Sequence, residues 1–184
     1  HVQVVPHLSG AQQISFDILS SLNNGTNELF LLCGELEDFS IDFIKAFSSI
    51  NVKIIEVKSL KRELGLHDLK AFIELYKIFK KHKFDIVHTN STKPAILARI
   101  TARLAGSKKI IHTVHGVAFH KYVPFIKRLF FYTAEFFSLF FGHKQISVNR
   151  FYKKYYPFFD TETIYNGVDF SNFHILSSNK KSSK

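Results

Sequence analysis

Residues 85–114 read DIVHTNSTKPAILARITARLAGSKKIIHTV and hold a complete unit of strand, helix and strand. The apolar runs at 85–89 and 109–113 have the length and the β-branched content of buried strands. Between them, the apolar residues of 94–105 recur at helical spacing, and Gly106 follows as a helix terminator. The stretch therefore predicts two neighbouring parallel strands joined by a helix that covers one face of a sheet.

The same alternation continues on both sides of this unit. Further strands are predicted at 2–5, 29–33, 52–57, 145–148 and 163–165, and further helices at 12–22, 41–47, 69–81 and 124–141. Repeated units of this kind imply an α/β fold, a Rossmann-like parallel sheet with helices on both faces. A chain of 184 residues with 46% hydrophobic content suits one core. We therefore predict one domain over 1–170 and a polar linker or disordered tail over 171–184.

Charge is distributed unevenly along the chain. Residues 1–60 hold three lysines and seven acidic residues, a net charge of −4, whereas the remainder holds 22 basic and eight acidic residues, a net charge of +14. The second part should therefore attract anionic partners. Nucleic acid, an anionic membrane and a phosphorylated substrate all meet that requirement, so the motifs have to decide between them.

Ligands of an open parallel sheet bind beyond the carboxyl ends of its strands, so the loops that follow the strands are the places to search. The loop at 6–11 brings Gly10 to the start of a helix, where free backbone N–H groups attract anions; a simple tight turn is the alternative. A basic loop follows at 58–62. The loop at 88–93 offers hydroxyl, amide and amine groups that suit a polyhydroxy ligand, or helix capping instead.

The loop at 112–120 is the richest in titratable groups. An imidazole donates or accepts a hydrogen bond near neutral pH, and this loop contains several. With no acidic residue or thiol nearby, a zinc site is not favoured. We interpret His112 as a histidine satisfied within the core and His115 as a functional residue.

Residues 118–144 combine ten aromatic side chains with several cations. Lys127, Arg128 and Glu135 interrupt the apolar character, so the segment is too short for a spanning helix, which needs about 20 apolar residues. A helix lying in the membrane interface fits this composition, and a wholly buried helix with a basic end is the alternative. The predicted membrane-contact residues are Lys121, Lys127, Arg128, Phe130 and Phe131.

Taken together, four segments of the chain resemble a known family. They read DIVHTNSTKP at 85–94, AILAR at 95–99, IHTVHGVAFH at 111–120 and IYNGVD at 164–169. They are similar to the N-terminal, acceptor-side halves of GT-B glycosyltransferases of family 4, which act in the synthesis of bacterial capsule, exopolysaccharide and the O-antigen of lipopolysaccharide. The resemblance spans nearly the whole chain.

The resemblance implies retaining sugar transfer, without metal or cofactor, from a nucleotide-sugar to an acceptor that is commonly lipid-linked. It implies a peripheral protein at the inner, cytoplasmic face of the bacterial plasma membrane, with an anionic membrane surface as partner and no nucleic acid. Carried onto this sequence, Gly10 would approach the donor diphosphate and His115 would contact the donor sugar as the catalytic residue. Arg62, Asn90 and Lys93 would line the acceptor region.

Departures from the family pattern are equally informative. The first loop reads Ser9, Gly10, Ala11, Gln12 where the family usually has two glycines, a small residue and a glutamate, and Asn90 stands where the family usually has histidine. The C-terminal donor domain normally carries two glutamates with seven residues between them, and it is expected to be absent, because no pair of glutamates in the sequence has that spacing. Half a cleft should be close to inactive alone.

Two other functional classes remain as alternatives. The chain would be the membrane-recruiting acceptor subunit of a glycosyltransferase made of two polypeptides, or a basic α/β domain that binds nucleic acid through its cations and aromatic residues.

Overall fold

The computed structural model describes residues 1–90, 92–120 and 122–167. The helices are α1 (Gly10–Leu22), η1 (Asp38–Ser40, a 3-10 helix), α2 (Ile41–Ser49), α3 (His67–His82), α4 (Thr92–Ala105), α5 (Phe125–Leu139) and α6 (Arg150–Lys153). The strands are β1 (Phe30–Cys33), β2 (Lys53–Glu56), β3 (Ile86–Asn90), β4 (Lys109–Val114), β5 (Lys144–Ser147) and β6 (Thr161–Thr163). Each predicted helix is present.

All strand pairs of the described chain are parallel, as predicted. β1 pairs with β2, and β3, β4, β5 and β6 follow one another in a second ladder. Val2 joins the two groups, because it bridges Leu32 on one side and Thr89 on the other. The sheet order is therefore β2, β1, the segment around Val2, β3, β4, β5 and β6.

Two strands differ from the sequence prediction. The predicted strand at 2–5 is reduced to the bridge at Val2, although Val4 O still accepts a hydrogen bond from Gly34 N at 2.8 Å. The last strand lies at Thr161–Thr163 rather than at 163–165. The register explains that shift, since Thr161 is the residue that pairs with Gln145 of β5. The predicted tail at 171–184 lies outside the described residues.

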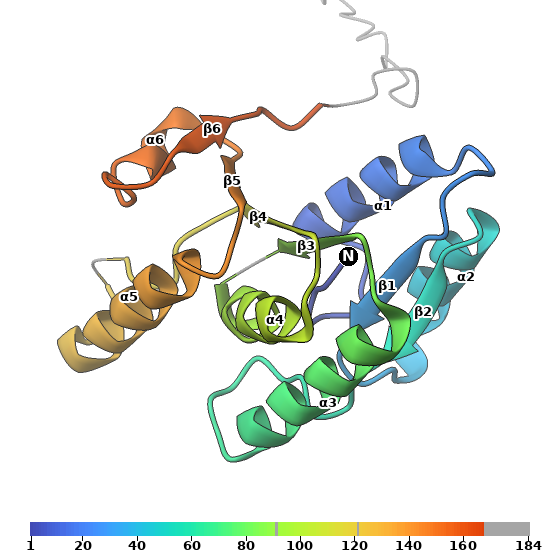
Figure 1. Ribbon diagram of the computed structural model, residues 1–184, viewed down its shortest axis with the longest axis horizontal. Helices are drawn as coiled ribbons and strands as arrows, with labels where there is room; N and C mark the ends of the chain where they lie inside the picture. The colour runs from blue at the N-terminus through green and yellow to red at the C-terminus, as the bar shows by residue number, and fades with distance from the viewer. Residues whose placement is uncertain (91, 121, 168–184) are drawn as a thin grey trace, which may run out of the picture.

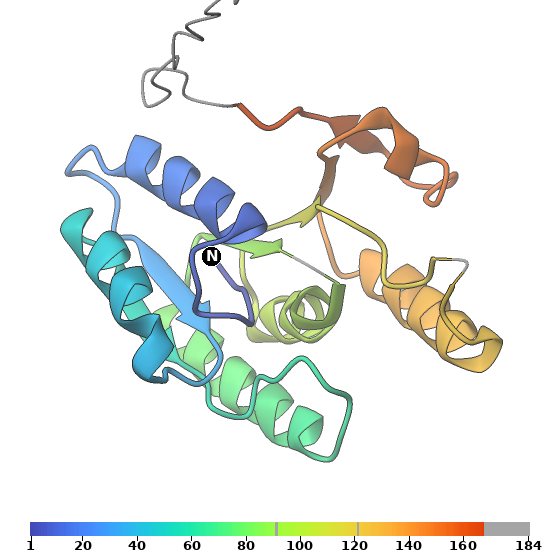
Figure 2. The ribbon, with the colours of Figure 1, turned by 180° about the vertical axis from the view of Figure 1, so that it is seen from behind.

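Helices cover both faces of the sheet (Figures 1 and 2). On one face α3 and α4 pack on the strands, with Phe79 and Ala98 in the core, and α5 lies beside α4. On the other face α1 and α2 enclose Phe43, Phe47 and the thiol of Cys33. This two-sided burial matches the near-continuous apolar strands of the sequence. It leaves the carboxyl ends of the strands as one open rim.

Candidate functional site

Asn90 and His115 meet at the carboxyl rim of the sheet. Asn90 is the last residue of β3 and pairs in register with Thr113 of β4, and His115 follows directly after β4. Nε2 of His115 lies 3.1 Å from Oδ1 of Asn90. The amide nitrogen of Asn90 in turn donates to Oγ of Ser15, in α1, at 3.3 Å. Three elements distant in the sequence therefore converge on one short chain of polar groups.

Gly10 belongs to the same rim. It is the first residue of α1 and precedes Ser15 by five residues, which is about 7.5 Å along a helix axis. Its φ of +37° is a conformation that side chains with a Cβ rarely adopt, and the residue is exposed. No side chain caps this helix start. Gln12 N donates to Ser9 O at 2.8 Å, and the N–H groups of Gly10 and Ala11 at this helix start are left for a ligand.

The two predicted acceptor-binding cations have different surroundings. Lys93, in the first turn of α4, forms an ion pair of 2.7 Å with Asp68 of α3 and contacts the carbonyl of Glu63. Arg62 is exposed in the loop between β2 and α3 and forms no ion pair or hydrogen bond within the described chain. Of the two, Arg62 is the cation that a ligand can reach without displacing a protein partner.

Burial disfavours the charged form of the histidines near the rim. Burial lowers the pKa of His115, and it lowers the pKa of His88, whose Nε2 lies 2.7 Å from Oγ1 of Thr113, to about 3. Burial also holds the pKa of His112 well below its usual range, and Nδ1 of that ring lies 3.1 Å from the carbonyl of Thr89. His112 is therefore the core histidine that the sequence indicated. Within the described residues no group of three possible metal ligands occurs.

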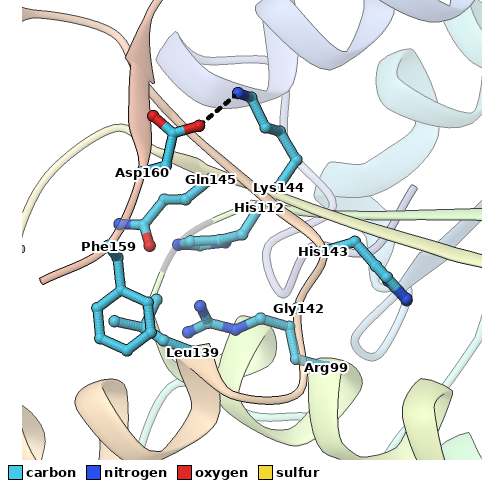
Figure 3. A pocket seen from close by; sticks show the side chains of 9 residues that line it. All are labelled: Arg99, His112, Leu139, Gly142, His143, Lys144, Gln145, Phe159 and Asp160. Carbon is cyan, nitrogen blue, oxygen red and sulfur yellow. Dashed lines mark hydrogen bonds and ion pairs between the residues drawn. The ribbon is translucent and has the colours of Figure 1, made fainter.

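A second polar cluster lies below the rim, between α4, α5 and the strands (Figure 3). The guanidinium of Arg99 is bound to Glu135 at 2.8 Å and to Ser138 at 2.6 Å, and all three side chains are buried. Burial raises the pKa of the Glu135 carboxyl. His112 and Gln145 line the same hollow, a cavity of ≈ 130 Å³. The cluster joins α4 to α5 and does not touch the carboxyl rim.

Helix α5 exposes much of its aromatic surface. Phe130 is 52% exposed, and Lys127 beside it is also exposed. The guanidinium of Arg128 lies 5.6 Å from the ring centre of Phe125. Phe131 differs from the others, because it packs partly against the core around Val114. Lys121, the remaining predicted membrane contact, lies outside the described residues. The large apolar side chains exposed on α5 are Phe125, Ile126, Leu129, Phe130, Tyr132 and Phe137.

Sequence reasoning singled out Asn90 and His115 but missed Ser15. The sequence offers one hint, a polar serine among the apolar residues of a helix, but this hint does not identify Asn90 as its partner. The contact depends on how α1 lies across the end of β3, which is a tertiary feature.

Among the described residues, no helix is long and apolar enough to cross a bilayer.

The open parallel sheet with its polar rim defines a half of a GT-B glycosyltransferase fold, and comparison with known proteins agrees. The model of Glycosyltransferase Family 4 matches residues 10–172, so the chain belongs to this family. A solved glycosyltransferase from Rickettsia africae ESF-5 superposes with a TM-score of 0.66 over 94% of this chain and 45% of that chain, at 22% identity, which shows the shared fold.

A curated relative gives a closer sequence match. The chain is 45% identical over 123 residues to the UDP-Gal:alpha-D-GlcNAc-diphosphoundecaprenol alpha-1,3-galactosyltransferase of Escherichia coli. The match covers 65% of this chain and 30% of the relative. The chain thus spans less than half the length of the proteins it is similar to.

Proposed function

We propose that the chain is the acceptor-binding half of a retaining, metal-independent glycosyltransferase of bacterial surface polysaccharide synthesis. It would serve transfer of a sugar from a nucleotide-sugar to a lipid-linked saccharide. The observation that supports the proposal is the polar rim of a Family 4 chain: His115 contacts Asn90, and Asn90 contacts Ser15 of α1, the helix that begins at Gly10. The name of the Escherichia coli relative, which specifies a diphosphoundecaprenol-linked sugar, supports the class of acceptor.

In this proposal the neutral imidazole of His115 contacts the donor sugar, and the open start of α1 at Gly10 faces the donor diphosphate. Both roles suit the site, since an uncharged imidazole can pair with a hydroxyl and free N–H groups attract phosphate. Arg62 supplies a cation for the acceptor diphosphate. The second glycosyltransferase domain would close over this rim and exclude water from the reacting groups.

The outward surface of α5 supports contact with an anionic membrane. A lipid-linked acceptor stays in the bilayer, so the half that binds it has to approach the membrane. Exposed rings such as Phe130 can enter the interface, and each nearby cation, Lys127 for example, adds about 1 kcal/mol at an anionic surface. On this proposal the chain acts as a peripheral protein at the cytoplasmic face of the plasma membrane.

Kinetics of the complete enzyme test the role of His115. His115→Ala should lower kcat by roughly 10²-fold or more if the imidazole contacts the donor in the transition state. His82→Ala, at the exposed end of α3, is the matched control and should leave the rate unchanged. An unchanged rate in His115→Ala would assign the histidine a structural role only.

Co-sedimentation with vesicles tests the membrane surface. Anionic vesicles should retain the protein at about 0.1 M salt, where charges are screened beyond about 10 Å, and neutral vesicles should bind it weakly. The double change Lys127→Glu and Arg128→Glu should reduce retention, whereas Lys80→Glu with Lys81→Glu on α3, an equal change in charge, should not. Competition by duplex DNA at equal phosphate would favour the nucleic-acid alternative instead.

A further inference from the structure

The side chain of Asn90 is less available to a ligand than its place at the rim suggests. The residue is only 2% exposed, and both ends of its amide already face protein groups. Its nitrogen lies 3.3 Å from Oγ of Ser15, and its oxygen lies 3.1 Å from Nε2 of His115. Ser15 is itself 1% exposed. A buried amide with both ends engaged is arranged to hold a neighbour rather than to bind a hydroxyl.

We propose that Asn90 is a positioning residue for His115, and that Ser15 holds the far end of its amide while the amide oxygen faces the imidazole. The proposal rests on the proposed function of His115 for its catalytic meaning, but the geometry stands without it. An amide oxygen can only accept, so Nε2 of His115 must carry the proton. The other ring nitrogen, Nδ1, is then an acceptor, and no described residue forms a hydrogen bond to it. Nδ1 is the atom left to receive a hydrogen bond from a sugar hydroxyl.

A neutral partner suits this task better than a charged one would. A carboxylate at position 90 would stabilise the imidazolium, which has no lone pair to offer a hydroxyl. The titratable groups coupled to His115 on the neighbouring strands are His88 on β3 and His112 on β4, and burial is the largest cause that lowers the pKa of each of the three rings. The amide therefore fixes the ring and its proton without adding charge to a rim of neutral histidines.

The amide can take two orientations, because the hydroxyl of Ser15 can accept from the amide nitrogen or donate to the amide oxygen. With the nitrogen turned toward α1 it donates to the serine hydroxyl, as observed. The reverse orientation would present an N–H to Nε2 of His115 and would require the ring proton to sit on Nδ1. The two arrangements thus predict opposite tautomers of one histidine, which can be measured directly.

Nitrogen NMR of the protein labelled with ¹⁵N-histidine provides the primary test, and it needs no activity. We expect His115 to be protonated at Nε2, with that proton protected from exchange with water. Asn90→Leu should abolish the protection, and Ser15→Ala should weaken it by roughly fivefold, the worth of one hydrogen bond. Ser21→Ala, an exposed serine at the end of α1, is the control. Protonation at Nδ1, or protection unchanged in Asn90→Leu, would overturn the proposal.

Asn90→Asp keeps the shape of the side chain and guards against a misfolded Leu variant. The carboxylate should raise the pKa of His115 by roughly one unit or more, as seen by the same NMR titration. In the complete enzyme the acid limb of the kcat profile should move to higher pH, with little change in the KM for acceptor. A raised acceptor KM with an unmoved pKa would instead make Asn90 an acceptor-binding residue.

These readouts separate the two ideas. If His115→Ala leaves transfer intact while the NMR signature holds, the proposed role of His115 fails and the positioning contact remains. If His115→Ala abolishes transfer while Asn90→Leu leaves the ring proton protected, the proposed function stands and the positioning role fails.

Discussion

Helices α4 and α5 lie side by side on one face of the sheet, yet they place their side chains in opposite ways. α4 turns small apolar residues inward, since Ala95, Ala98 and Ala102 are completely buried. α5 buries the polar side chains of Glu135 and Ser138 and turns most of its aromatic rings outward. The first pattern is that of an ordinary core helix. The second reverses it.

The difference shows that α5 has two separate attachments. Inward, it is held by a buried ion pair with Arg99 of α4, an interaction that needs hydrogen bonds to offset the loss of solvent. Outward, its rings contribute little to the core, so folding alone does not account for them. A surface of this kind marks a contact with another apolar phase, which agrees with the proposed membrane role.

We expect the largest effect from a substitution that breaks the buried ion pair between α4 and α5. Glu135→Ala leaves the guanidinium of Arg99 buried without its carboxylate, and we expect a loss of about 3–5 kcal/mol in the free energy of unfolding. Urea denaturation measures this. Lys108→Ala removes an ion pair with Asp85 whose partners are both 77% exposed, and it should leave the free energy of unfolding nearly unchanged. An equal loss in the free energy of unfolding for Glu135→Ala and Lys108→Ala would contradict the idea that the buried pair holds α5 to α4.

The second prediction concerns acid. The folded-state pKa values of His88, His112 and His115 lie below the usual value of 6.5, so the unfolded chain binds protons that the folded chain does not. Stability is therefore complete above about pH 6.5 and falls below it, by up to about 1.4 kcal/mol per pH unit for each histidine. Glu135, whose pKa is raised by burial, opposes this trend by at most one proton.

Denaturation at pH 7.5, 6 and 5 checks the acid prediction. His112→Gln, which removes the one of these three histidines that lies beside the Arg99–Glu135 pair, should give a shallower slope. A free energy of unfolding that stays constant from pH 6.5 to pH 5 would mean that these rings accept protons in the folded protein.

We expect the smallest effect on stability from a substitution in the exposed aromatic surface of α5. Phe130→Ala on α5 should change the free energy of unfolding by less than about 0.5 kcal/mol, because the ring is 52% exposed, while lowering retention on anionic vesicles. Phe79→Ala, in the core under α3, is the matched change and should cost about 3–5 kcal/mol. Similar losses for both rings would make α5 an ordinary core helix.

Most of the fold could be predicted from the sequence, because the buried strands and the helices of 94–105 and 69–81 carry strong periodicity. The prediction was wrong where the pairing of a strand depends on the segments beside it. Residues 2–5 are strand-like in sequence, but only Val2 forms a bridge. For the site, loops after strands correctly drew attention to Asn90 and His115. Their mutual contact, the burial of Asn90 and the support from Ser15 depend on packing between segments 75 residues apart, which periodicity does not encode.

The bridge at Val2 also has a consequence for the order of folding. The backbone N–H of Val2 bonds to His88 O, and Leu32 N bonds to His1 O. This short segment therefore joins the β1–β2 ladder to the β3–β6 ladder, which are not paired directly with each other among the described strands. The contact between Val2 and His88 closes a longer loop of chain than the contact between His1 and Leu32, and it therefore costs more chain entropy. Contacts between residues so distant in the sequence slow folding. We expect each half to assemble from its local strand and helix units first. The segment around Val2 would then be among the last to reach its place in the sheet.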